Sequence, residues 1–273
     1  MTAAVRSQTV QTVDGVRLHV EASGVGETIL FIQGLGYATW AWTPQVDALA
    51  DRARAVAFDN RGAGQSDKPD GPYSIRLLAE DALAVLQQTG AGPAHVVACS
   101  MGGYVALTLA LRHPRAVRSL ALISTSAGGD EASGVPEQTL TAWRSAAGVS
   151  AEEFARRTMP LSFAPGWADA HPSEFDRWLQ ARLAHPTPPA AWKAQFDASA
   201  RFLAEGLGPG PIPHPTLVIH GTEDRVVPYA NARPLVERLD DARLVTLRGA
   251  GHLCWLEQSD AVNDLLAEFV AEI

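Results

Sequence analysis

The sequence predicts an α/β fold in which a mostly parallel sheet is covered by helices on both faces. Short apolar runs such as 28–32 and 95–99 suit strands that are buried on both faces. These runs alternate with helical patterns such as 75–88, and this alternation is typical of a parallel sheet whose strands are connected by helices. Hydrophobic residues make up 47% of the 273 residues and charged residues only 19%, which favours one large core.

Composition also narrows the partners and the compartment. The net charge is −8 and no basic run occurs, so we expect neither nucleic acid nor an anionic membrane surface as a partner. Cys99 and Cys254 are too few for a disulfide framework and lack zinc-site spacing, so we expect free thiols in a reducing cytoplasm. Residues 1–15 contain no apolar segment typical of a signal peptide, and no apolar run approaches the ~20 residues of a membrane span.

The first part of the chain carries most of the expected sheet. Strands are expected, in order, at 7–13, 16–22, 28–32, 54–58, 95–99 and 117–123. Helices are expected at 44–49, 75–88 and 104–112. Asp14-Gly15 is a good hairpin turn between the first two strands, and Pro114 ends the helix that precedes it.

The strand pattern stops after residue 125 and resumes near residue 213. Ser150-Ala151-Glu152-Glu153 is a capping box, and Pro188-Pro189 suits the first turn of another helix. We therefore expect residues 126–212 to form a helical cap, and residues 1–125 and 213–273 to form the core. In the second core segment, strands are expected at 216–220 and 244–247, and helices at 231–239 and 261–273.

A serine stands between a strand and a helix with almost no loop between them. Ser100 follows the apolar run 95–99, and Gly102-Gly103 follows Ser100 after one residue. Such a sharp turn strains the serine backbone and needs small neighbours, because another backbone segment approaches closely. The turn presents the Ser100 hydroxyl at the carboxyl end of the sheet and makes it a candidate nucleophile. Cys99 is interpreted as a packing residue at the end of the strand.

A serine nucleophile needs a base and an orienting acid. Asp224 and His252 follow two later strands, and the carboxyl ends of parallel strands meet at one edge of a sheet. The chain order Ser, Asp, His suits this fold. Glu223 is the alternative acid and His220 the alternative histidine, although the position of His220 suggests packing or support of the acid. The expected catalytic triad is Ser100, His252 and Asp224.

The reaction also needs donors for the oxyanion of the tetrahedral intermediate. The backbone N–H of Met101 lies at the start of the helix after Ser100, where such donors point outward. The glycine-rich loop Gln33-Gly34-Leu35-Gly36 follows an earlier strand, and we assign the second donor to the N–H of Leu35. Gly34 and the cap residues Trp143, Met159, Trp167 and Trp192 are candidate pocket residues, with plain core packing as the alternative for each tryptophan.

Five motifs together resemble the α/β-hydrolase superfamily over essentially the whole chain. They are Gln33-Gly34-Leu35-Gly36, Asp59-x-Arg61-Gly62-x-Gly64-x-Ser66, Ser100-Met101-Gly102-Gly103, Gly221-x-x-Asp224-x-x-x-Pro228 and Gly251-His252. Ala98 replaces the first glycine of the G-x-S-x-G nucleophile elbow, and Gln33 stands where many members have histidine. In the family the segment from Asp59 to Ser66 is mainly structural. The chain is most similar to small esterases and lactonases with a helical cap, including 3-oxoadipate enol-lactonase-like enzymes.

The resemblance implies a serine hydrolase that cleaves a small-molecule ester or lactone through an acyl-enzyme, with no metal or organic cofactor. The same triad would also serve C–C bond hydrolysis of a diketone or cofactor-free perhydrolysis. A ligand receptor that kept the fold and the triad is a third interpretation. Serine at position 100 argues against the haloalkane dehalogenase and epoxide hydrolase subgroups, which use aspartate there. The sequence leaves the oligomeric state open.

Overall fold

The computed structural model describes residues 5–145 and 148–273. Its centre is an eight-stranded sheet in the order β1-β2-β4-β3-β5-β6-β7-β8. Strands β1 and β2 pair antiparallel, β2 pairs antiparallel with β4, and the remaining neighbours are parallel. The α/β fold expected from the sequence is therefore confirmed. The strands are β1 (Arg6–Gln11), β2 (Arg17–Ser23), β3 (Thr28–Ile32), β4 (Arg54–Phe58), β5 (Ala94–Cys99), β6 (Val117–Ile123), β7 (Thr216–Gly221) and β8 (Ala242–Leu247).

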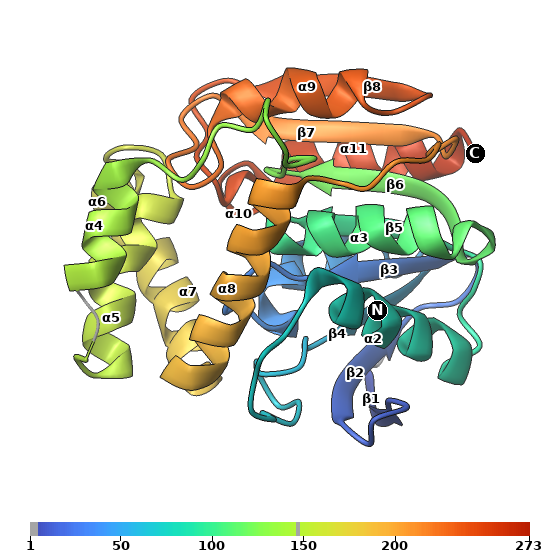
Figure 1. Ribbon diagram of the computed structural model, residues 1–273, viewed down its shortest axis with the longest axis horizontal. Helices are drawn as coiled ribbons and strands as arrows, with labels where there is room; N and C mark the ends of the chain where they lie inside the picture. Colours follow the sequence, from blue (N-terminus) through green and yellow to red (C-terminus); the bar gives the residue numbers. More distant parts are fainter. Residues whose placement is uncertain (1–4, 146–147) are drawn as a thin grey trace.

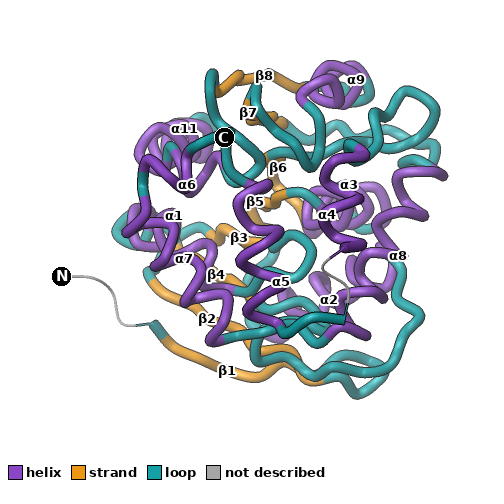
Figure 2. The backbone as a smooth tube through the Cα atoms, turned by 90° about the vertical axis from the view of Figure 1, so that its left-hand side faces the viewer, coloured by secondary structure: helices purple, strands orange, loops and turns teal. Residues whose placement is uncertain are grey.

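Helices cover both faces of the sheet, as Figure 2 shows. One face packs against α2 (Ile75–Gln88), α3 (Met101–Arg112) and α9 (Ala232–Glu237). The other face packs against α1 (Thr43–Leu49), α10 (Cys254–Glu257) and α11 (Ser259–Ala271). The two hydrophobic clusters on either side of the sheet make up its core, and strands β3 and β5 are buried along their whole length between them. This arrangement explains why these two strands are continuous apolar runs.

The described residues between β6 and β7 contain five α-helices and no strand. The helices are α4 (Glu137–Ser145), α5 (Ala151–Thr158), α6 (Trp167–Ala170), α7 (Pro172–Ala184) and α8 (Pro189–Glu205). The Ser150 hydroxyl accepts a hydrogen bond from the N–H of Glu153 at 3.1 Å and caps α5. Figure 1 shows these helices gathered beyond one end of the sheet, at the left of the view. Short 3₁₀ turns complete the chain at η1 (Thr39–Trp42), η2 (Pro114–Ala116), η3 (Met159–Ser162) and η4 (Tyr229–Asn231).

The expected boundaries differ from the observed ones mainly at element ends. The helix after Ser100 begins at Met101, three residues earlier than expected, because Gly102 and Gly103 belong to its first turn. The first strand ends at Gln11, and Val13 lies exposed in the turn that follows. None of the helices in the described residues is both long and apolar enough to cross a membrane.

Candidate active site

Ser100 lies at a strained turn between β5 and α3. Its φ of 52° and ψ of −124° are rare for a residue other than glycine. The Ser100 N–H donates to Ile123 O at 3.0 Å, and the Ser100 carbonyl accepts from Gly103 N–H and the Thr125 hydroxyl, both at 2.8 Å. These hydrogen bonds tie the turn to β6 on one side and α3 on the other, and so hold the strained conformation in place.

The glycines after Ser100 are required by close packing. A Cβ at Gly102 would lie 2.4 Å from the carbonyl oxygen of Ile32, and a Cβ at Gly103 would lie 2.3 Å from the Thr125 hydroxyl oxygen. A Cβ at Gly34 would lie 3.1 Å from the Cβ of Ser100, so the loop after β3 lies directly against the serine. Close packing therefore leaves no space for a side chain at Gly102 or Gly103, as the sequence predicts for a sharp turn.

Asp224 and His252 form a buried pair. The Nδ1 of His252 lies 2.8 Å from the Oδ2 of Asp224. The other carboxylate oxygen, Oδ1, accepts hydrogen bonds from the N–H groups of Val226 at 2.8 Å and Val227 at 2.9 Å. Burial alone would raise the pKa of Asp224, but the charges and hydrogen bonds of His252 and His220 lower it to about 2. The carboxylate is thus ionised at neutral pH and orients the imidazole.

His220 and Glu223, the two alternatives, take other places. His220 is fully buried, and its Nε2 donates to Val227 O at 2.9 Å while lying 3.3 Å from Asp224 Oδ2. His220 therefore lies against the Asp224 carboxylate and is not among the residues that line the cavity. Glu223 is exposed. Of the two neighbouring carboxylates, only Asp224 contacts His252.

Ser100 and His252 line one cavity of about 280 Å³, together with Gly34, Leu35 and Met101. The structure thus brings together the candidate nucleophile, the candidate base and both residues expected to supply oxyanion donors. Within the described residues, the Ser100 hydroxyl makes no direct hydrogen bond to the imidazole. Cys99 also borders the cavity, but burial raises the pKa of its thiol well above the usual range, so the thiol stays protonated.

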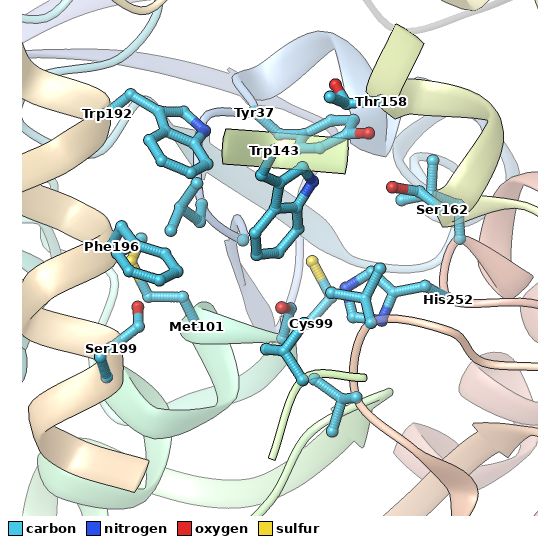
Figure 3. Close-up of a pocket in the computed structure, with 18 of the residues that line it drawn as sticks. Tyr37, Cys99, Met101, Trp143, Thr158, Ser162, Trp192, Phe196, Ser199 and His252 are labelled. Carbon is cyan, nitrogen blue, oxygen red and sulfur yellow. The ribbon is translucent and has the colours of Figure 1, made fainter. Parts of the chain in front are cut away.

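Helix α8 forms one wall of the cavity, as Figure 3 shows. Trp192, Phe196 and Ser199 project from it at a spacing of four and three residues, which places them on one helical face. Trp143 from α4 contacts Trp192 edge to face, with ring centroids 5.7 Å apart. Trp143 and Trp192 were candidate pocket residues, whereas Phe196 and Ser199 were missed although their helical spacing from Trp192 is visible in the sequence.

Two candidate pocket residues do not line this cavity. Met159 is fully buried in the hydrophobic cluster that also contains Phe163 and Trp178. Trp167 stacks on Phe163 with ring centroids 4.4 Å apart and an angle of 8° between the planes. The structure does not place Met159 and Trp167 at this cavity, because Met159 is buried in the hydrophobic core and Trp167 stacks on Phe163.

Two further residues line the cavity but were not predicted from the sequence. They are Tyr37, which lies just before η1, and Arg182 of α7. The guanidinium of Arg182 lies over the Tyr37 ring, 5.0 Å from its centroid, and an Nη1 is 3.4 Å from the Tyr37 hydroxyl. The two residues are 145 positions apart, so no local pattern could pair them.

A short segment of the helical region joins the loops that carry Asp224 and His252. Arg225 donates through Nη2 to the carbonyls of Pro160 at 2.9 Å and Phe163 at 3.0 Å. Glu257 accepts from the N–H groups of Gly251 at 3.0 Å and Ala164 at 3.2 Å. Residues 160–164 therefore contact Arg225, which follows Asp224. Through Glu257 they also connect to Gly251, which precedes His252.

Gln33 opens the glycine-rich loop 33–36, but its side chain makes no hydrogen bond to that loop. Its side chain is fully buried, and its Nε2 has no hydrogen-bond partner. Its Oε1 lies 3.6 Å from the Cys99 thiol. The loop is instead fixed from outside, because the Gln33 carbonyl accepts a hydrogen bond from Asn60 Nδ2 at 3.0 Å. In residues 5–145 and 148–273 no cluster of three or more His, Cys, Asp or Glu side chains could hold a metal ion.

A family model described as alpha/beta hydrolase fold matches residues 27–258. The chain belongs to the α/β-hydrolase family. This match spans all five motifs, so the resemblance inferred from them is confirmed. The chain is accordingly a member of a family of hydrolases.

Similar proteins share the fold over nearly the full chain. The protein named "Putative carbamate hydrolase RutD" of Azorhizobium caulinodans is 30% identical over 261 residues, covering 94% of this chain and 96% of that protein. The 2-hydroxymuconate semialdehyde hydrolase of a Pseudomonas strain is 28% identical over 278 residues, covering 94% and 92%. The crystal structure of the enol-lactonase from Burkholderia xenovorans superposes with a TM-score of 0.81 at 27% identity, covering 97% of this chain and 100% of that one. These names describe cleavage of different bonds.

Proposed function

We propose that this protein is a serine hydrolase that cleaves a carboxylic ester or a lactone of a small molecule. The observation that carries the proposal is the hydrogen-bonded pair of Asp224 and His252 beside a cavity that Ser100 also lines. The similarity to an enol-lactonase at 27% identity over nearly the whole chain supports this type of bond.

In the proposed mechanism Ser100 attacks the substrate carbonyl. Asp224 accepts the hydrogen bond from Nδ1 of His252, so Nε2 is the nitrogen that takes the serine proton. The contact between the hydroxyl and Nε2 forms as the substrate binds, since catalytic hydrogen bonds often tighten only in the complex. The imidazolium then gives the proton to the leaving alcohol, and an acyl-enzyme on Ser100 remains.

The tetrahedral intermediate carries a negative oxygen that needs donors. We propose that the backbone N–H groups of Leu35 and Met101, both at the cavity wall, supply them. Losing one such donor typically costs about 3 kcal/mol of transition-state stabilisation. In the second half of the reaction His252 takes a proton from water, the resulting hydroxide attacks the acyl carbon, and Ser100 leaves with that proton.

We propose that residues 126–212 act as a cap and that residues 1–125 and 213–273 act as the catalytic core. Helices α4, α5, α7 and α8 each contribute side chains to the cavity wall. The cap therefore sets which acyl and alcohol groups fit, while Ser100, His252 and Asp224 all come from the core.

C–C bond hydrolysis is the second candidate, and one observation favours it. A 2-hydroxymuconate semialdehyde hydrolase is 28% identical over 94% of this chain. The same serine, histidine and aspartate would serve such a reaction. Turnover of a vinylogous diketone at a rate above that of any ester would favour this candidate.

The test is a series of p-nitrophenyl esters of increasing acyl length, assayed with the wild-type protein and with Ser100→Ala. We expect measurable turnover by the wild type and its loss in the variant, because Ser100 is the proposed nucleophile and burial keeps the neighbouring Cys99 thiol protonated. A fluorophosphonate probe should add its mass to the peptide that contains Ser100.

Ser173→Ala is the matched control, because Ser173 is exposed in the first turn of α7. It should retain both ester turnover and probe labelling. Equal rates for the wild type and Ser100→Ala would refute the proposed mechanism. Tight ligand binding with labelling of Ser100 but without turnover would point to the receptor interpretation.

A further inference from the structure

A glutamine from α8 connects two core loops behind the candidate oxyanion site. The side chain of Gln195 is fully buried. Its Oε1 accepts a hydrogen bond from the N–H of Gly36 at 2.9 Å, and its Nε2 donates to the carbonyl of Arg61 at 2.9 Å. Both ends of the amide are therefore satisfied by backbone groups 159 and 134 positions away in the sequence.

Helix α8 packs against the same two loops. A Cβ at Gly36 would lie 2.9 Å from the Cδ1 of Trp192, and a Cβ at Gly62 would lie 3.1 Å from the Cβ of Ala191. Each of these glycines has a positive φ, 72° and 89° respectively. These close contacts place α8 directly against both loops, and so bring the Gln195 amide within hydrogen-bonding distance of their backbone groups.

We propose that Gln195 is a positioning residue that orients the glycine-rich loop 33–36, which carries the proposed oxyanion donor Leu35. Leu35 precedes Gly36, and glycine at that position leaves the loop free to rotate unless something holds it. The hydrogen bond from Gly36 N–H to Gln195 fixes the peptide plane between Leu35 and Gly36. That plane limits how the neighbouring N–H of Leu35 can point toward the cavity. This inference rests on the proposed function, which assigns that N–H to the oxyanion.

The helix that shapes the cavity therefore also holds the loop that stabilises the transition state. Trp192 and Phe196 face the cavity from the residues on either side of Gln195 along α8. Gln195 itself faces the loops instead of the cavity, and it is not among the cavity-lining residues. It acts on the reaction only through Gly36 and Leu35.

The experiment compares two variants of the full-length protein. Gln195→Met removes both hydrogen bonds at nearly constant volume, whereas Gln195→Glu keeps an acceptor for Gly36 N–H. Each variant is assayed for kcat and KM on the best p-nitrophenyl ester. Each is also assayed for binding of a trifluoromethyl ketone, which forms a hemiketal oxyanion on a serine enzyme.

We expect Gln195→Met to lower kcat by about 10²-fold and to weaken ketone binding by a similar factor, with KM changed by less than about threefold. Gln195→Glu should retain more activity than Gln195→Met although its buried carboxyl makes it the less stable of the two. A purely structural role predicts the opposite order, with activity following stability. If Gln195→Glu does not fold, Gln195→Met alone still tests the inference through its kcat, its KM and its binding of the ketone.

Gln45→Met is the matched control, because Gln45 is another fully buried glutamine, in α1, that bridges to α10 and α11. It should lower Tm without separating ketone binding from KM. The inference is overturned if Gln195→Met lowers Tm but leaves kcat and ketone binding as in the wild type. A wild-type protein that binds neither the ketone nor the fluorophosphonate would overturn the proposed function, and this inference with it.

Discussion

At the scale of single residues, the environment of Asp224 decides what His252 can do. Asp224 is fully shielded and accepts hydrogen bonds from two backbone N–H groups and from the imidazole. An ionised carboxylate can only accept, so the Nδ1 of His252 carries a proton. The other ring nitrogen, Nε2, is then unprotonated in the neutral ring and is available as a base.

Replacing Asp224 by asparagine tests this tautomer argument. The amide of Asp224→Asn keeps the volume but can present an N–H to His252, which would favour the wrong tautomer. We expect kcat to fall by about 10⁴-fold with little change in KM. Steady-state kinetics on a p-nitrophenyl ester measure both values.

Glu223→Gln is the control for this variant, because Glu223 is the adjacent carboxylate but is exposed. Its kcat should match that of the wild type. An Asp224→Asn protein with wild-type kcat would contradict the assignment of the acid.

At the scale of elements, the junction of β5 and α3 is held by backbone contacts. Gly102 allows the first turn of α3 to lie against the carbonyl oxygens of Ile32 and Gln33, at the end of β3. The Ile32 carbonyl is held in place, since β3 is paired with β4 and β5 on its two sides. The strand, the turn and the helix therefore share one set of contacts.

Adding one methyl group at this junction should be costly. In Gly102→Ala the Cβ would lie 2.4 Å from Ile32 O, so we expect α3 to shift and the free energy of unfolding to fall by about 2–3 kcal/mol. Urea denaturation followed by circular dichroism measures this change.

Gly134→Ala is the matched control, because a Cβ at Gly134 would meet no atom within 4 Å and its φ is not positive. Its stability should stay within about 0.5 kcal/mol of the wild type. Equal losses in the two variants would indicate that the cost arises from backbone entropy rather than from the contact with β3.

At the scale of the whole molecule, Glu257 joins the core to the helical segment. Burial raises the pKa of Glu257 to about 7. Hydrogen bonds from the N–H groups of Gly251 and Ala164 and the charge of Arg225 lower this pKa, whereas the charge of Asp224 raises it. In the unfolded chain the pKa of a glutamate lies near its usual value of 4.5. Between these two pH values the folded state binds more protons than the unfolded state.

The sign of the resulting pH dependence follows from proton linkage. Where the folded state binds more protons, the free energy of unfolding falls as pH rises. As the pH rises from 4.5 to 7, the raised pKa of Glu257 should therefore lower the free energy of unfolding by up to about 3 kcal/mol. Partial exposure of the side chain reduces this amount. Glu257→Gln should lack this loss, so it should gain stability relative to the wild type from pH 5 to pH 8.

Urea unfolding of both proteins at pH 5 and pH 8 measures the difference. Glu268→Gln, a change at an exposed glutamate on α11, provides the control and should follow the wild type at both pH values. A constant difference between Glu257→Gln and the wild type would contradict a raised pKa at this position.

Much of the core could be predicted from local sequence patterns. The ranges 28–32, 54–58 and 117–123 match β3, β4 and β6, and 75–88 matches α2. A clear signal also bounds α2, since Ser74 caps this helix through a hydrogen bond from Leu77 N–H at 3.1 Å. Ser100, Asp224 and His252 could be proposed because each follows a strand, and parallel strands bring their carboxyl ends to one edge.

The helical segment was far less predictable in detail. Its amphipathic patterns indicate helices, but they do not say which face meets the core and which meets the cavity. Trp143 and Trp192 line the cavity, whereas Trp167 stacks on Phe163 and Met159 enters the core. The direction of each side chain depends on how α4 to α8 pack on one another, which no local pattern contains.

The sequence by itself determined the sheet, the strained serine turn and the order of the three candidate catalytic residues. Each of these depends on short-range periodicity, on small residues beside a sharp turn, or on the rule that parallel strands share one edge. Only the tertiary structure decided that Gln195 bridges Gly36 and Arg61, and that residues 160–164 join the loops of Asp224 and His252. The reason is that such hydrogen bonds link segments 60 to 160 positions apart, roughly, and exist only once the chain has packed.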